Sequence, residues 1–259
     1  MSVVATPSVH ALLREFVANS PRRHYLPDTE GIELSNQAAL VREVVVAVQA
    51  CLEPDLAAVR TSEPDDGSGI RVVVAVAQYD EILRTLLDTA PLIESGRMST
   101  VWTLLRSAAD RLRILAGLES ARGDDVARHL ATSATHARAR FTAAATADDV
   151  DLGLSSAFCP AGAVSPVTVP TLSAPPPAIA NLIEHIDLGA ATGRDGSTHE
   201  TDYDHLAMVG GYQLRLMLEI IRAATDSLCE IVDPAVGDDF WTEKAGDVRA
   251  AVEFAWDCV

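Results

Sequence analysis

The sequence of 259 residues contains a single lysine, Lys244, and too few basic residues to balance its acids. Asp and Glu number 37 against 20 Lys and Arg, so the formal net charge is −17. Proteins that bind nucleic acid or anionic membranes need a basic surface, because their affinity comes from neutralising phosphates. The densest basic run, Arg22-Arg23-His24, is too short to reverse this balance. We therefore expect no nucleic acid and no membrane among the partners.

Long hydrophobic runs and paired cysteines are also missing. The longest apolar run, Val72–Ala77, is far shorter than the roughly 20 residues that span a bilayer. The first residues lack the basic and apolar pattern of a signal peptide. The cysteines show neither CxxC pairing nor metal-ligand spacing; they are Cys51, Cys159, Cys229 and Cys258. These absences predict a soluble, cytoplasmic protein with reduced thiols, and they leave a homodimer open.

Aromatic residues make up only 5% of the chain, so any flat ligand would depend on a few of them. Those few are Trp102, Tyr203, Tyr212, Trp241 and Trp256. No Ser-His-Asp or Cys-His nucleophile arrangement has a recognisable local signature. The glycines of residues 189–196 do not follow the GxGxxG spacing and no lysine follows them, which argues against a phosphate-binding loop.

What the sequence does contain is pervasive three-to-four spacing of apolar residues, which is typical of amphipathic helices. Residues 70–74 also have strand propensity, but no second segment of comparable strength could pair with them, which favours helix. The predicted fold is all-α, a single-domain bundle of roughly eight helices. The expected helices are 7–18, 36–59, 70–90, 100–118, 124–145, 178–188, 203–232 and 238–257.

Three kinds of local chemistry mark where these helices begin or break. Ser35 and Ser99 are the expected N-caps of two of them, and Pro54 is expected to kink or divide helix 36–59. Asp124 and Asp125 suit the positive end of the dipole of helix 124–145.

The chain also divides by composition. Residues 1–150 predict an N-terminal helical bundle, and residues 177–259 predict C-terminal helices packed on it in one compact domain. Between them, residues 151–176 are rich in proline, which removes amide donors and disfavours helix. We expect this segment to be an extended connection, either a linker or a lid.

Imidazoles and carboxylates are densest between residues 185 and 205. His185, His199, Asp202 and His205 supply the ligand types that iron, zinc and manganese use, around one loop and close to a helix start. They are the predicted metal ligands, although HETDYDH matches no established ligand spacing. The alternative is a solvated loop in which Asp202 caps the next helix. His129 and His136 are expected to be solvated flank residues.

These groups suggest a metal-dependent, iron-type enzyme acting on a small organic molecule, for example an oxygenase of bacterial specialised metabolism. Arg194 could orient a substrate carboxylate, and Tyr212 could donate a proton or a hydrogen bond. The alternative is a non-catalytic helical protein that binds a partner or a small ligand in an apolar groove. Gly210-Gly211, inside a long predicted helix, indicates close approach by another helix or by a ligand.

The Gly/Thr-bearing loop 189–198, which follows a helix carrying His185, resembles the loop of the tryptophan dioxygenase superfamily. That resemblance covers about ten residues, and the chain departs from it at Ala190-Ala191 and Arg194-Asp195. It implies an all-helical fold and haem iron with His185 as axial ligand. It also implies a substrate contact from Thr192 or Ser197. The cofactor prediction is therefore iron, either haem or non-haem.

Overall fold

The structure is a computed structural model, and it describes residues 30–61, 69–120, 122–147, 174–192, 203–236 and 240–259. These residues form seven helices. Their bounds are α2 Glu30–Thr61, α3 Gly69–Glu94, α4 Met98–Glu119, α5 Gly123–Ala147, α6 Pro177–Thr192, α7 Tyr203–Val236 and α8 Phe240–Trp256. The prediction of an all-helical bundle is confirmed, and no strand occurs among the residues just given.

Seven of the eight expected helices are present, and the eighth, 7–18, lies outside the described residues. Residues 70–74 belong to α3, so the choice of helix over strand for this segment was correct. The Pro-rich connection falls almost wholly within 148–173, which the structure does not describe. The division of the chain into three segments therefore stays a prediction.

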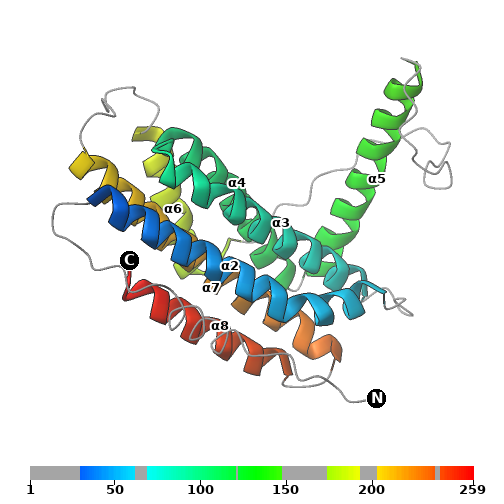
Figure 1. Cartoon of the computed structure of the whole chain (residues 1–259). Coiled ribbons are helices and arrows are strands. Elements are labelled where there is room, and N and C mark those ends of the chain that lie inside the picture. The colour runs from blue at the N-terminus through cyan, green and yellow to red at the C-terminus, as the bar shows by residue number, and fades with distance from the viewer. Residues whose placement is uncertain (1–29, 62–68, 121, 148–173, 193–202, 237–239) are drawn as a thin grey trace.

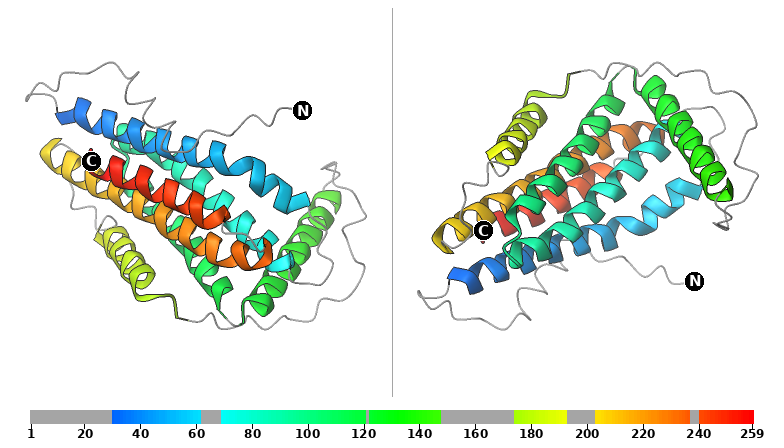
Figure 2. Two further views of the ribbon diagram at one scale, coloured as in Figure 1. Left: turned by 90° about the horizontal axis from the view of Figure 1, so that it is seen from below. Right: turned by 90° about the horizontal axis from the view of Figure 1, so that it is seen from above.

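Helix α7 runs through the middle of the bundle and packs against α2, α3, α4 and α8 (Figure 1). Helix α6 lies on the outside, against α4 and α7, while α5 crosses the far end beside α3 and α4 (Figure 2). At the end opposite α5, the starts of α2 and α7 lie close to the end of α8 (Figure 1). This end of the molecule carries most of the features described below.

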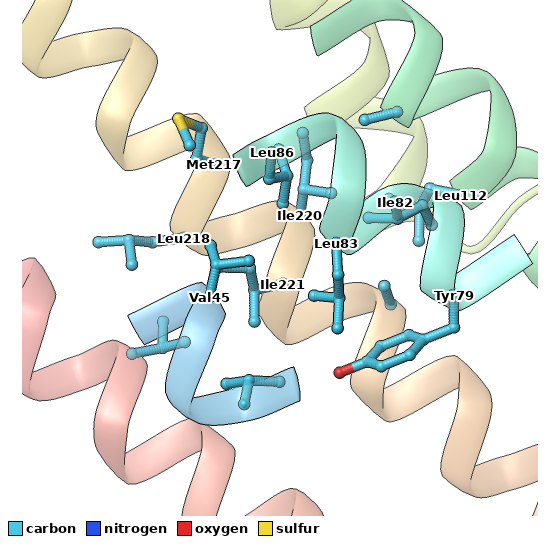
Figure 3. Packing of buried hydrophobic residues seen from close by; sticks show 14 of the residues in the cluster. Val45, Tyr79, Ile82, Leu83, Leu86, Leu112, Met217, Leu218, Ile220 and Ile221 are labelled. Carbon is cyan, nitrogen blue, oxygen red and sulfur yellow. The ribbon is translucent and has the colours of Figure 1, made fainter. Parts of the chain in front are cut away.

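The core is a single cluster of apolar side chains contributed by all the described helices. Val45 of α2, Leu112 of α4 and Ile220 of α7 are fully buried in it. Figure 3 shows these side chains meeting those of α3 between the helices. The three-to-four spacing of the sequence places such residues on one stripe of each helix, and burying the stripes holds the bundle together.

Two predicted helix starts were wrong. Helix α2 begins at Glu30, so Ser35 lies inside it and caps nothing. The earlier start is supported by Leu34, which is only 9% exposed and packs on the core. Pro54 lies inside α2 without dividing it. Helix α4 begins at Met98 rather than after Ser99.

The start of α4 is set by the tight turn that joins it to α3. Gly96 has a positive φ of 72°, which glycine adopts without strain. The amide of Arg97 donates to the Leu92 carbonyl at 2.9 Å, which closes the turn. Arg97 then occupies the N-cap position without a side-chain cap hydrogen bond. Helix α4 therefore starts at the buried Met98 and not after a serine N-cap.

The prediction for α5 is confirmed, because Asp124 and Asp125 lie in its first turn.

The only lysine of the chain connects α8 to α2 by hydrogen bonds. The ammonium of Lys244 donates to the Cys51 carbonyl at 3.0 Å and to the Asp55 carboxylate at 2.5 Å. None of the described helices has the length and apolar character needed to cross a bilayer.

Candidate functional site

Two of the residues singled out in the sequence, His185 of α6 and Tyr212 of α7, are in direct contact. The Tyr212 hydroxyl lies 2.8 Å from Nδ1 of His185, and either atom can be the donor, depending on the imidazole tautomer. The rings meet edge to face with centroids 6.4 Å apart. Partial burial raises the pKa of Tyr212 above its usual value. The phenol therefore stays protonated near neutral pH.

Trp102 of α4 packs against the Tyr212 ring of this pair. Its ring is tilted against that of Tyr212 at a centroid distance of 6.2 Å, and it is 7% exposed. A Cβ atom added to Gly189 would lie only 2.3 Å from the Trp102 ring. Glycine at 189 therefore lets the backbone of α6 approach the indole closely, which brings His185 within reach of Tyr212.

The loop expected at residues 189–192 is helical, because α6 continues to Thr192. Gly189 packs on Trp102 and Ala190 is buried, so both residues gain contacts by staying in the helix. The apolar spacing of α6 places Ile183 and Ile186 in the core, and Glu184 is exposed.

Ion pairs also fasten α6 to α4. The carboxylate of Asp187 lies 3.5 Å from Nε of Arg106 and 3.6 Å from the guanidinium of Arg113. All three side chains are partly exposed, so these pairs fix the orientation of α6 more than they stabilise the fold.

A groove with a volume of about 440 Å³ opens beside Tyr212 at the end of the bundle where α2, α7 and α8 meet. Its lining among the described residues is Leu34, Gln37, Ala207, Met208, Gly211, Tyr212, Arg215 and Val259. Two large apolar side chains are exposed here, Met208 at 66% and Tyr212 at 41%. The groove therefore combines apolar surface with three polar side chains.

The glycine pair in α7 has two different roles. A Cβ on Gly210 would lie 2.8 Å from the Leu34 side chain, so this residue serves the close packing of α7 on α2. A Cβ on Gly211 would have no described atom within 4 Å, and Gly211 lines the groove. The expectation of close helix packing is thus correct for Gly210, whereas Gly211 faces open space.

Arg215 is the cation of the groove. Its guanidinium carbon lies 5.6 Å from the centroid of the Trp256 ring, a cation–π contact that holds the side chain across α7 and α8. Glu219, one turn further along α7, pairs with Arg222. No carboxylate of the described residues forms an ion pair with Arg215.

A second, smaller hollow of about 320 Å³ lies between α4 and α6. It includes Leu188, which is 59% exposed, and Arg113. Unlike Arg215, Arg113 is paired with acids, at 2.8 Å to Asp110 and 3.6 Å to Asp187.

Three of the six predicted metal and catalytic residues lie outside the described part of the chain, and the side chain of a fourth is not described. Arg194, His199 and Asp202 belong to residues 193–202, and His205 lies in the first turn of α7 with its side chain undescribed. Within the helices that can be described, no three His, Cys, Asp or Glu side chains are grouped to hold a metal ion. The metal site therefore stays a prediction, with His185 as its one described residue.

Reasoning from the sequence missed the groove, because it is assembled from three helices that are distant in the chain. Leu34, Gln37 and Val259 carry no motif that marks them as neighbours of α7. The one usable signal in the sequence was Gly210-Gly211 within a long helical pattern. Glycine lowers helix stability, so its presence inside a helix indicates that another helix or a ligand approaches closely.

Comparison of the chain with models of protein families, with curated proteins and with solved structures gave no match.

Proposed function

We propose that this protein is a non-catalytic helical binding protein that holds a small organic molecule in the groove between α2, α7 and the end of α8. The observation that carries the proposal is Gly211. Glycine inside a helix costs about 1 kcal/mol relative to alanine, yet a Cβ at position 211 would meet no described atom within 4 Å, so packing among the described residues does not require glycine there. The absence of a side chain at this position leaves space in the groove instead.

The size and chemistry of the groove support the same function. Its volume of about 440 Å³ falls within the roughly 300–1,000 Å³ typical of ligand sites. Such sites are mainly apolar with a few polar groups that orient the ligand. Leu34 and Met208 supply apolar surface here, while Gln37, Tyr212 and Arg215 supply the polar groups.

Filling the groove tests the proposal. We would screen the protein by ligand-observed NMR against a mixed set of neutral, anionic and cationic fragments. Gly211→Leu should abolish binding of the hits, because its side chain would occupy the groove. Gly246→Leu is the matched control, since Gly246 also lies in a helix with no described atom within 4 Å of its Cβ position. Hits that bind equally well to both variants would contradict the proposal.

A second candidate is the metal-dependent enzyme that the sequence suggests. The observation in its favour is the His185–Tyr212 contact at Nδ1. Histidines that bind metals commonly have their second ring nitrogen oriented by a hydrogen bond, and Tyr212 could do this for His185 while Nε2 coordinates. Iron bound with His199, Asp202 and His205 would activate oxygen or water, and Tyr212 would hold a proton at its hydroxyl.

Metal analysis and an ultraviolet–visible spectrum of the protein, purified without chelators, test this candidate. His185→Ala should remove the bound metal, whereas His129→Ala should retain it, because His129 lies on α5 beside Ser133, far from α6 along the bundle. Wild-type protein without stoichiometric metal or haem would reject the enzyme mechanism and leave the binding function in place.

A further inference from the structure

We infer that the ligand of the groove is a small amphipathic carboxylate, whose anionic head pairs with Arg215 and whose apolar body lies along Met208. This inference rests on the proposed binding function and adds the chemical class of the ligand. It follows from the charges around the groove and from the order in which apolar and polar groups line it.

Arg215 differs from most of the arginines whose side chains the structure describes. Eight described arginines have an Asp or Glu within 4.0 Å; they are Arg84, Arg106, Arg111, Arg113, Arg122, Arg128, Arg222 and Arg249. Arg215 contacts the neutral ring of Trp256 instead. A cation–π contact orients the guanidinium without neutralising its charge, so an ion pair can still form.

The hollow between α4 and α6 provides a comparison within the same molecule. It also contains an arginine and an exposed leucine. Its Arg113 is already paired with Asp110 and Asp187, and the acids Glu184 and Asp187 belong to its lining. An anion would meet like charge there. The α2–α7–α8 groove has no Asp or Glu side chain in its described lining. The carboxyl group of its lining residue Val259 accepts a hydrogen bond from Gln37 at 3.5 Å and forms no described ion pair with Arg215. Arg215 is therefore open to an anion in a way that Arg113 is not.

The lining also limits the head to a single charge. Arg215 is the only charged side chain among the described lining residues, and a carboxylate matches its planar guanidinium. The hydroxyl of Tyr212 can add a hydrogen bond to this head when Nδ1 of His185 carries the proton of the pair. On the same helix, Met208 and Ala207 lie about two turns before Arg215, so the apolar body extends toward the start of α7.

The experiment compares three probes of similar length by isothermal titration calorimetry, namely octanoate, octan-1-ol and octylamine. We expect octanoate to bind about five- to tenfold more tightly than octan-1-ol, the gain of one charge-assisted pair at a partly exposed site. Octylamine should bind most weakly, because its charge would face Arg215.

Four variants separate the contribution of the charge from that of the groove. Arg215→Gln should reduce octanoate binding to the level of octan-1-ol, and Arg215→Lys should retain part of the difference. Arg84→Gln is the control for net charge, since Arg84 is exposed, pairs with Glu81 and lies outside the groove. Octan-1-ol binding by every arginine variant reports whether the groove is intact, and Gly211→Leu should weaken both octanoate and octan-1-ol.

The outcomes separate the two proposals. If octanoate and octan-1-ol bind equally well and both are lost in Gly211→Leu, the carboxylate inference is wrong and the binding function stands. An octanoate preference that survives Arg215→Gln would also overturn the inference, because the head would then lie elsewhere. If no probe binds with any dependence on Gly211, both proposals fail.

Discussion

The two halves of α7 differ in what surrounds them, although they share one helix and one amphipathic pattern. In the second half, polar side chains find protein partners. Thr225 accepts or donates a hydrogen bond at 2.8 Å to the buried Tyr79 hydroxyl, and Asp226 pairs with Arg249 at 2.8 Å. In the first half, Met208 is 66% exposed and Arg215 has no acid partner among the described residues.

This difference separates the part of the helix that packs in the core from the part that is exposed at the groove. Buried, fully partnered groups stabilise a bundle, and changing them destabilises it. Exposed apolar groups beside an unneutralised cation add little stability and are what a ligand would contact. The core half of α7, residues 216–232, should therefore control stability. In the groove half, residues 207–215, the buried Gln213 still donates to the Met98 carbonyl at 3.1 Å, and the groove-lining residues Met208, Gly211, Tyr212 and Arg215 should control binding.

The largest expected effect comes from truncating one apolar side chain in each half. Ile220→Ala removes a fully buried side chain and should lower the free energy of unfolding by about 2–5 kcal/mol. Met208→Ala removes an exposed one and should change it by less than about 0.5 kcal/mol. Urea unfolding followed by circular dichroism measures both. Similar losses for the two variants would contradict the proposed difference between the two halves of α7.

Removing a tyrosine hydroxyl from each half gives the next largest effect. Tyr79→Phe removes the buried hydrogen bond to Thr225, whose hydroxyl keeps its bond to the Ile221 carbonyl, and should cost about 1–2 kcal/mol. Tyr212→Phe removes a hydroxyl from a side chain that is 41% exposed and should cost less than about 0.5 kcal/mol. Chemical denaturation compares the two, with octanoate titration of Tyr212→Phe as a second readout. If Tyr212→Phe were the more destabilising change, the groove half would have a structural role.

Gly210 and Gly211 allow the same comparison at adjacent positions, because one packs on α2 and the other lines the groove. Gly211→Ala should stabilise the protein by about 0.5–1 kcal/mol through helix propensity, since its Cβ meets no described atom. Gly210→Ala gains the same propensity but places its Cβ 2.8 Å from Leu34. We expect it to be less stable than Gly211→Ala in thermal unfolding. Equal stabilisation would show that Leu34 moves aside without cost.

The smallest expected effect is a pH dependence at the core half. Burial raises the pKa of Glu119, and this outweighs the opposing hydrogen bond from Ser227 and the charge of Arg71. The unfolded chain releases this proton near pH 4.3, before the folded protein does. The free energy of unfolding therefore decreases as the pH rises from about 4.3 to the pKa of Glu119 in the folded protein. Above that pKa it decreases no further.

Replacing the carboxyl group of Glu119 should remove this decrease in stability with rising pH. The melting temperature of Glu119→Gln should exceed that of the parent by more at pH 7 than at pH 4. A constant difference across this range would mean that the proton of Glu119 is not linked to folding.

The helices were predictable because apolar spacing is a local property. The core faces of α6 and α7 follow from it, and Ile183, Ile186, Ala224 and Leu228 are all buried as expected. Helix ends were less predictable. Ser35 and Ser99 have good capping chemistry, but burial of Leu34 and Met98 extended the helices past them.

The candidate site was predictable only in part. His185 and Tyr212 were both singled out from the sequence, but nothing local indicated that they would touch across 27 positions. Their contact depends on Gly189 packing against Trp102, and the sequence analysis had placed Gly189 in a loop. The position of Arg215 on Trp256 is likewise a tertiary contact, which local spacing within α7 does not indicate.

The central claim is that the groove half of α7 binds a ligand, and mapping a bound probe tests it most directly. We would titrate isotope-labelled protein with octanoate and follow amide and methyl chemical shifts. The account predicts that the changes concentrate at Leu34, Met208, Gly211 and Arg215, with little change around Thr225. Changes centred instead on Leu188 and Arg113, or spread evenly over the bundle, would contradict it.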